Sequence, residues 1–171
     1  MSDDTEEAAN VSGLPAKMRD DEIEGVRRVR AALVLAQLDY RREIAALSQR
    51  GYDVADIARA VGVPGYKFAE TVRVAQETAP IPEGFSGATV REICQRYFLG
   101  QITQEQVIHE LTTWDYAIPE PRELGEFEEY EELPPSPPNS LNDVVQACQD
   151  GVLDGTTYET IIRAVMKRRQ A

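Results

Sequence analysis

The chain is poor in the residues from which catalytic and metal sites are most often built. It has one histidine, His109, and two cysteines, Cys94 and Cys148, among 171 residues. A single histidine with no cysteine near it in sequence gives no metal-ligand set at a recognisable spacing. No Ser-His-Asp, Cys-His or phosphate-loop motif can be assembled either. We therefore expect no metal, no cofactor and no catalytic residues, in a protein that is not an enzyme.

Long hydrophobic runs are also absent. No apolar stretch approaches the roughly 20 residues that a membrane-spanning helix needs. The N-terminal stretch MSDDTEEAANVSG is acidic, whereas a signal peptide is basic and then apolar. The two cysteines lie at apolar positions of helical patterns, which is typical of reduced thiols in a cytosolic protein. The sequence thus predicts a folded cytoplasmic protein without a membrane partner.

Positive charge is in deficit, since 18 Lys and Arg against 30 Asp and Glu give a net charge of −12. Non-specific nucleic-acid binding is disfavoured, because its affinity comes from neutralising phosphates. The deficit is uneven. Residues 17–77 hold eleven basic and ten acidic side chains, and the excess acid lies in the first seven residues and in residues 115–132. A nearly neutral N-terminal region with acidic appendages is compatible with specific DNA binding.

Residues 51–77, GYDVADIARAVGVPGYKFAETVRVAQE, predict two short helices joined by a tight turn. Asp53 is placed to cap the first helix, and Gly62 to end it in the left-handed conformation. Apolar residues recur at helical spacing on the inner faces of both helices: Val54, Ile57, Ala58, Val61, Phe68, Val72 and Ala75. Two helices joined by a glycine-containing turn of about four residues form a helix-turn-helix.

Residues 52–75 resemble the helix-turn-helix family of DNA-binding domains in the spacing of four residues: Ala58, Gly62, Val63 and Phe68. The resemblance implies that the second helix enters a major groove. The outward side chains expected at the DNA are Gly65, Tyr66, Lys67, Glu70 and Arg73, of which Lys67 and Arg73 can reach phosphate or guanine. Pro64 and Gly65 stand where such motifs commonly carry a capping Ser or Thr. A protein-binding or purely structural three-helix unit is the alternative.

Residues 17–49 contain no proline and one glycine, and predict one long amphipathic helix. Its apolar residues step along one side at intervals of three and four: Ile23, Val26, Val29, Leu33, Ala36, Tyr40, Ile44 and Leu47. Leu35 and Leu38 widen the apolar surface beyond one stripe. A homodimer through this helix and a purely intrachain core are both compatible with that surface. Its arginines could add phosphate contacts or lie on an ordinary solvated face: Arg27, Arg28, Arg30, Arg41 and Arg42.

Two later segments repeat each other at an offset of 51 residues. Val90, Ile93, Cys94 and Tyr97 align with Leu141, Val144, Val145 and Cys148, and Gly100, Ile102 and Thr103 with Gly151, Leu153 and Asp154. Each segment predicts a helical hairpin, and the pattern resembles the short SHOCT-type hairpins appended to bacterial proteins. A hairpin of about 28 residues buries little by itself. Each therefore needs a neighbour, which is the other copy, the N-terminal unit or a separate protein.

The segment between the hairpins is acidic and ends in PPSPPN, which predicts an extended linker. Four aromatic residues lie in or beside it: Trp114, Tyr116, Phe127 and Tyr130. Large apolar anchors among glutamates could bind a basic protein partner. The same segment could instead lie against the arginine-rich long helix, or be an inert spacer with its aromatics tucked back on the domain.

Together these patterns predict an all-α protein. The expected units are an acidic disordered tail at 1–16, the long helix with helix-turn-helix at 17–78, a linker at 79–87, a hairpin at 88–116, an acidic proline-rich linker at 117–139 and a second hairpin at 140–169. The expected function is a small cytoplasmic transcriptional regulator that binds double-stranded DNA and engages a protein partner through its C-terminal half. This layout is similar to that of bacterial antitoxins. The alternative is an adaptor or inhibitor that never binds DNA and occupies a basic partner through its acidic surface.

Overall fold

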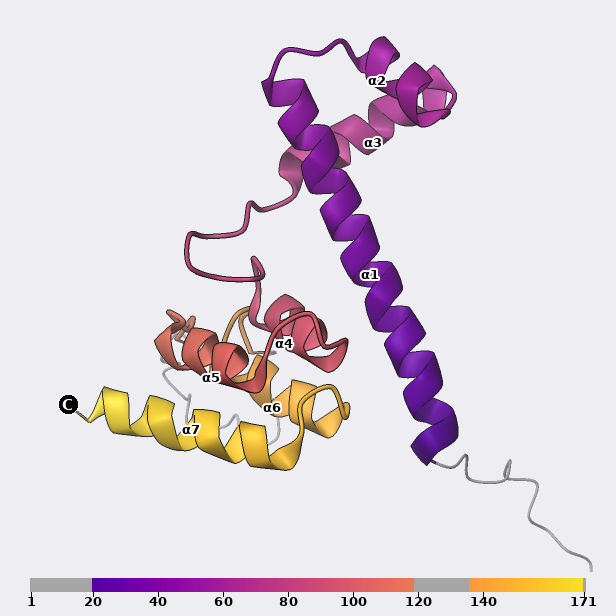
Figure 1. Ribbon diagram of the computed structural model, residues 1–171. Coiled ribbons are helices and arrows are strands. Elements are labelled where there is room, and N and C mark those ends of the chain that lie inside the picture. The colour runs from indigo at the N-terminus through magenta and orange to yellow at the C-terminus, as the bar shows by residue number, and fades with distance from the viewer. Residues whose placement is uncertain (1–19, 119–135, 171) are drawn as a thin grey trace, which may run out of the picture.

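The computed structural model describes residues 20–118 and 136–170 (Figure 1). All regular structure in those ranges is helical, which confirms the expected all-α class. The seven helices are α1 (Asp20–Gln49), α2 (Val54–Val61), α3 (Gly65–Glu77), α4 (Val90–Phe98), α5 (Gln104–Thr113), α6 (Leu141–Gln149) and α7 (Gly155–Arg169). None of these helices is both long and apolar enough to cross a membrane.

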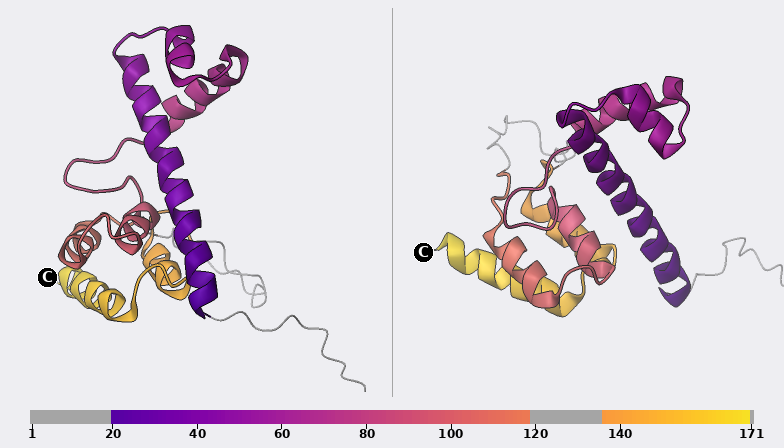
Figure 2. Two further views of the ribbon diagram at one scale, coloured as in Figure 1. Left: turned by 45° about the vertical axis from the view of Figure 1, so that its right-hand side comes forward. Right: turned by 45° about the horizontal axis from the view of Figure 1, so that its top comes forward.

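The helices enclose two separate hydrophobic cores. The first lies between α2, α3 and the C-terminal end of α1, a part that we call the head (residues 44–77). Its buried residues are Ile44, Ile57, Ala58, Phe68, Val72 and Ala75. The second core lies inside α4 to α7, which we call the four-helix unit. Figure 2 shows the head at one end of α1 and the four-helix unit beside the rest of that helix.

The head is built from local signals that the sequence carries. The Asp53 carboxylate accepts a hydrogen bond of 2.7 Å from the Ala55 N–H and so caps α2. Gly62 ends α2 with a φ of 71° and donates its N–H to α2 carbonyls. The structure therefore confirms the predicted cap and the predicted left-handed turn. Pro64 precedes α3 and offers no side-chain cap, so α3 begins without one.

Gly62 and Gly65 flank the turn and allow a matched stability test. Replacing Gly62 with alanine should lower the free energy of unfolding by about 1–2 kcal/mol, because a Cβ disfavours positive φ. Gly65 is the first residue of α3, has no positive φ, and has open space where a Cβ would lie. We expect Gly65→Ala to be neutral or stabilising, since alanine is the better helix former. Urea unfolding of both variants checks this, and equal losses would contradict the role given to Gly62.

The four-helix unit consists of two hairpins that complete each other's core. The bounds of α4 and α6 differ by 51 residues at both ends, and the starts of α5 and α7 by the same number. Gly100 and Gly151 both have positive φ in the equivalent loops. Thr103 and Asp154 both cap the helix that follows. Because α4 packs on α6 and α5 on α7, each helix lies against its counterpart as well as its hairpin mate.

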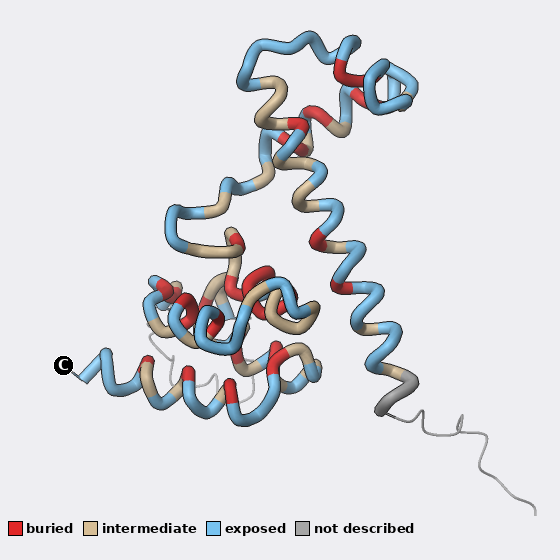
Figure 3. Tube along the Cα trace, in the orientation of Figure 1, coloured by how far each residue is buried: buried red, intermediate tan, exposed pale blue. Residues whose placement is uncertain are grey.

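Opposite faces of α1 are buried at different points along its length. Ala31 and Leu35 are 4% and 1% exposed, on the face that α4 covers. Ile44 is 2% exposed, in the core of the head. The predicted apolar stripe is covered only where the head begins, and Val26, Val29 and Leu33 remain exposed. Figure 3 shows that exposed positions predominate along the N-terminal part of α1.

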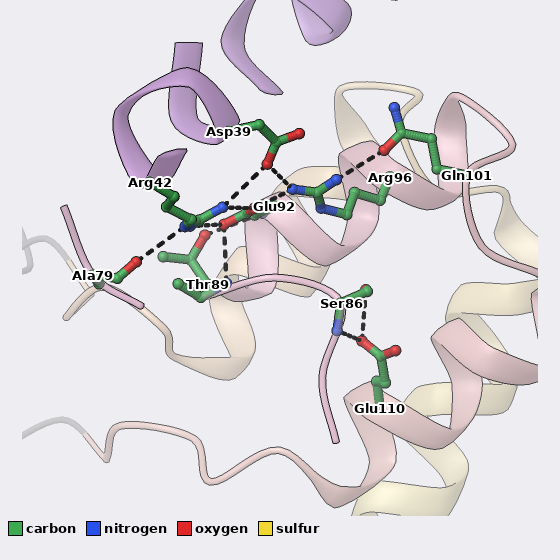
Figure 4. A network of polar contacts seen from close by, with 10 residues as sticks. Asp39, Arg42, Ala79, Ser86, Thr89, Glu92, Arg96, Gln101 and Glu110 are labelled. Atoms are coloured by element: carbon green, nitrogen blue, oxygen red, sulfur yellow. Dashed lines mark hydrogen bonds and ion pairs between the residues drawn. The ribbon is translucent and has the colours of Figure 1, made fainter. Parts of the chain in front are cut away.

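A buried ion-pair network fixes α1 to the four-helix unit (Figure 4). The Glu92 carboxylate of α4 accepts two hydrogen bonds from Arg42 of α1, at 2.6 and 2.8 Å. Arg96 donates to the same carboxylate at 2.8 Å and to Asp39 of α1. The Arg42 Nε donates to the Ala79 carbonyl at 3.2 Å. The network therefore ties α1, the connection that leaves the head, and α4 to one another.

Candidate nucleic-acid interface

Helix α3 presents one covered and one open face. Phe68, Val72 and Ala75 are 0–6% exposed and pack inward, as their spacing predicts. Among the described helices, α3 packs against α1 and α2 only. The four-helix unit lies along α1, away from the α2–α3 turn (Figure 1). The outer face of α3 is thus left open by the rest of the described chain.

The five residues predicted at the DNA are all exposed and belong to this helix. Gly65 begins α3, and the Tyr66 side chain beside it is 80% exposed. The Lys67 ammonium lies 5.8 Å from the centre of the Tyr66 ring, within range of a cation–π contact. Glu70 and Arg73 follow along the helix, and both are exposed. All five residues therefore lie on exposed positions of α3, where a ligand can reach them.

Arg73 is held by two carboxylates of its own helix. Its guanidinium donates to Glu70 at 2.6 and 2.9 Å and to Glu77 at 2.6 Å. The hydrogen bond from Arg73 lowers the pKa of Glu70, and hydrogen bonding and charge from Glu70 raise that of Arg73. Glu77 was not singled out from the sequence, although its spacing of four residues from Arg73 is the signal for such a pair. Three of the five N–H donors of this arginine are therefore engaged within α3, and a nucleic acid would share it with these carboxylates or displace one of them.

Three of the arginines considered as extra phosphate contacts lie on the face of α1 that meets the four-helix unit. Arg42 lies in the Glu92 network with its side chain 16% exposed, so it is not available to a phosphate. Arg28 donates to the Phe98 carbonyl at 3.0 Å and lies over the Phe98 ring. Arg27 lies beside Gly151, where an added Cβ would be 3.0 Å from its Nη1. Phosphate contact by Arg27 and Arg28 stays a prediction.

The structure describes two of the four aromatic residues that were predicted to anchor a partner. Trp114 is 9% and Tyr116 8% exposed, both in the core of the four-helix unit. The Trp114 and Phe85 rings meet edge to face at 4.9 Å, and the Tyr116 hydroxyl donates to the Leu111 carbonyl at 2.6 Å. Both side chains complete a small core, so the prediction that they are free anchors is corrected. Phe127 and Tyr130 lie outside the described residues.

The thiols and the histidine show no arrangement for chemistry. Burial raises the pKa of the Cys94 thiol to about 12, which leaves it protonated and unreactive at neutral pH. Cys148 is half-buried and free, and His109 lies on the exposed side of α5. Within the two described ranges, no three His, Cys, Asp or Glu side chains are grouped so that they could hold a metal ion.

Comparison with known proteins gave no match. No family model fits the chain, and neither a curated protein nor a solved structure is significantly similar to it. The functional proposal therefore depends on the chain's own residues.

Proposed function

We propose that this protein is a cytoplasmic transcriptional regulator that reads the major groove of double-stranded DNA with α3. The observation that carries the proposal is the open outer face of α3, which no other described helix covers. The turn that aims α3 depends on Gly62 in the left-handed conformation, at the position where a helix-turn-helix needs it. A helix with one face packed on two others and the opposite face free has the geometry that a recognition helix requires.

The side chains of α3 suit specific rather than general attraction to DNA. Lys67 and Arg73 can donate to phosphate or to guanine, and Glu70 can accept from the cytosine amino group. This face is electrically neutral, because the positive charges of Lys67 and Arg73 are balanced by the negative charges of Glu70 and Glu77. Exposed ion pairs contribute little to stability, so a guanine or phosphate can replace a carboxylate at Arg73. A neutral face attracts non-cognate DNA weakly, which leaves base contacts to determine the site.

The test is binding to the DNA upstream of the protein's own gene, with an unrelated duplex as control. We expect salt-sensitive binding to the first duplex only. Lys67→Glu with Arg73→Glu should weaken it by at least about 100-fold, because each reversal replaces an attraction to the DNA with a repulsion. Each phosphate that the variant no longer neutralises should also reduce the slope of log affinity against log salt by about 0.9.

The matched control is a double charge reversal on an exposed helix outside the head. Arg163→Glu with Lys167→Glu changes the net charge equally on α7, where both side chains are exposed. We expect the control to bind almost as the wild type does. Equal weakening by both variants would show that net charge, and not α3, determines binding. Unchanged binding by the α3 variant would remove α3 from the interface.

A second candidate function is favoured by the neutrality of the α3 face. An adaptor or inhibitor would use the head as a scaffold and occupy a basic protein partner through its acidic surface, with no DNA contact. The two carboxylates on Arg73 support this alternative, because they oppose phosphate. Absence of binding to the upstream duplex at low salt, where phosphate attraction is strongest, would favour it. A pull-down for a basic partner is then the next measurement.

A further inference from the structure

Helix α1 carries an apolar stripe that nothing in the described chain covers. Val26, Val29, Leu33 and Tyr40 are 69%, 71%, 59% and 41% exposed, and Ala36 between them is exposed as well. We call these five residues the bare stripe. Their intervals of three, four, three and four residues are those of a coiled-coil seam. Exposed aliphatic side chains gathered in one stripe mark an interaction surface more often than scattered ones do.

The bare stripe faces away from the four-helix unit and toward the side of the head. Leu33 and Leu35 are two positions apart, which places them on nearly opposite sides of an α-helix. Leu35 is buried on the side of α4, so Leu33 points the other way. Ile44 lies eleven positions after Leu33, about three turns, and so returns to the same side. The head therefore covers the continuation of the stripe and stops where the bare part begins.

We propose that the bare stripe binds the same stripe of a second copy of this chain, with the two α1 helices antiparallel and a two-fold axis near Leu33. A seam with this repeat fits a helix of the same repeat, and a second copy supplies one of equal length. No charged side chain lies within the bare stripe. Arg30, at its edge, would lie near Gln37 of the partner subunit, so the arrangement brings no like charges together.

The position of the head selects the antiparallel orientation. The head covers α1 from Ile44 onward on the same side as the bare stripe. A parallel partner in register would bring its own α1 to the place where the head is packed. In the antiparallel orientation, the N-terminal part of the partner's α1 lies beside Tyr40. The partner's head then lies beyond the N-terminal end of the bare stripe. Both bare stripes are then covered without moving either head.

The size of the seam indicates a weak dimer. The bare stripe runs for about 21 Å, since Tyr40 lies fourteen residues after Val26 and each step along the helix rises 1.5 Å. Specific interfaces bury about 1,000 Å² or more in total. The area buried by two stripes of this length, together with the side chains beside them, comes close to that lower bound. We therefore expect a dissociation constant in the micromolar range.

The dimer has a consequence for DNA reading, and this part rests on the function proposed above. With the axis near Leu33, the two Ile44 positions are about 33 Å apart along the helix pair. One turn of B-DNA is about 34–36 Å, the separation of the two half-sites that dimeric helix-turn-helix proteins bind. Self-association itself is measured without DNA, so it can succeed or fail independently of the proposed function.

Sedimentation equilibrium of the full chain between about 1 and 200 µM tests the dimer. We expect a reversible monomer–dimer equilibrium for the wild type and a dissociation constant at least about 100-fold higher for Leu33→Glu. Thr160→Glu adds the same charge at an exposed position of α7, outside the proposed interface. We expect it to dimerise nearly as the wild type does. A monomeric wild type at the highest concentration, or undiminished association of Leu33→Glu, would overturn the proposal.

Oxidative cross-linking tests the orientation. Val26→Cys and Tyr40→Cys are made separately, and we expect a disulfide-linked dimer when the two variants are mixed and none from either alone. The wild type, with its own Cys94 and Cys148, is the background control. Efficient cross-linking of each variant alone would indicate parallel helices and overturn the antiparallel assignment.

Discussion

Replacing Glu92 with alanine is expected to lower the free energy of unfolding by about 3–5 kcal/mol. The Glu92 side chain is 1% exposed, and those of Arg42 and Arg96 are 16% and 13% exposed. Removing the carboxylate leaves two guanidinium groups largely out of water without their shared partner, and this arrangement is much more costly than the loss of one hydrogen bond. Urea unfolding followed by circular dichroism measures the change.

The control is another ion pair with a short distance but no burial. Asp56 accepts from Arg59 at 2.6 Å, and the two side chains are 64% and 76% exposed. We expect Asp56→Ala to change the free energy of unfolding by no more than about 0.5 kcal/mol. If both variants lost similar stability, burial would not be the reason for the Glu92 effect.

Acid provides a second readout for Glu92. Burial alone would raise the pKa of Glu92, but hydrogen bonds from Arg42, the Ala88 N–H and Arg96 outweigh it and lower that pKa. A carboxyl whose pKa is lower in the folded than in the unfolded state contributes stability that is fully present above the unfolded pKa, about 4.3. That contribution is lost as the pH falls through the folded value. The stability difference between the wild type and Glu92→Ala should therefore shrink below about pH 4.

Replacing Phe68 with alanine is expected to unfold the head while the four-helix unit keeps its core. The Phe68 ring is fully buried and is the largest side chain among the six in the core of the head. Truncating a buried phenylalanine costs about 3–5 kcal/mol, and so small a core has few other contacts to compensate. The two cores share no buried residue, so the loss should stay local. Hydrogen exchange measured along the chain should show lost protection in α2 and α3 and retained protection in α4 to α7.

Tyr66→Ala is the matched control for Phe68→Ala. It removes an aromatic ring from the same helix two residues earlier, where the ring is 80% exposed. We expect protection in both parts of the molecule to remain as in the wild type. Loss of protection throughout the chain in Phe68→Ala would mean that the head and the four-helix unit fold as one cooperative body.

The features that could be predicted from the sequence are those set by neighbouring residues. Asp53 caps the helix that starts next to it, and Gly62 adopts a backbone conformation that its own lack of a Cβ permits. The inward positions Phe68, Val72 and Ala75 follow from helical periodicity, although the same periodicity wrongly placed Val54 and Val61 inward, where they are 37% and 43% exposed. The offset of 51 residues between the hairpins also appears directly in the bounds of their helices. None of these depends on how distant parts of the chain meet.

Features that depend on distant parts of the chain could not be predicted in this way. Thr89 and Glu92 have the spacing of a capping box, yet nothing local shows that the Glu92 carboxylate meets Arg42, fifty residues away. The apolar residues of α1 define its faces without indicating what covers each, so Leu33 and Leu35 look alike in sequence although they are 59% and 1% exposed. Trp114 gave a similar error, because a large ring beside an acidic segment suits a partner and a small core equally well.

The packing of each hairpin helix on its counterpart has a consequence for how the core forms. Two separate identical hairpins, related by a two-fold axis, would meet in the same way, α4 on α6 and α5 on α7. Separate hairpins would assemble this core only at a sufficient protein concentration. Because one chain carries both hairpins, the core forms within the molecule, and its formation does not depend on protein concentration.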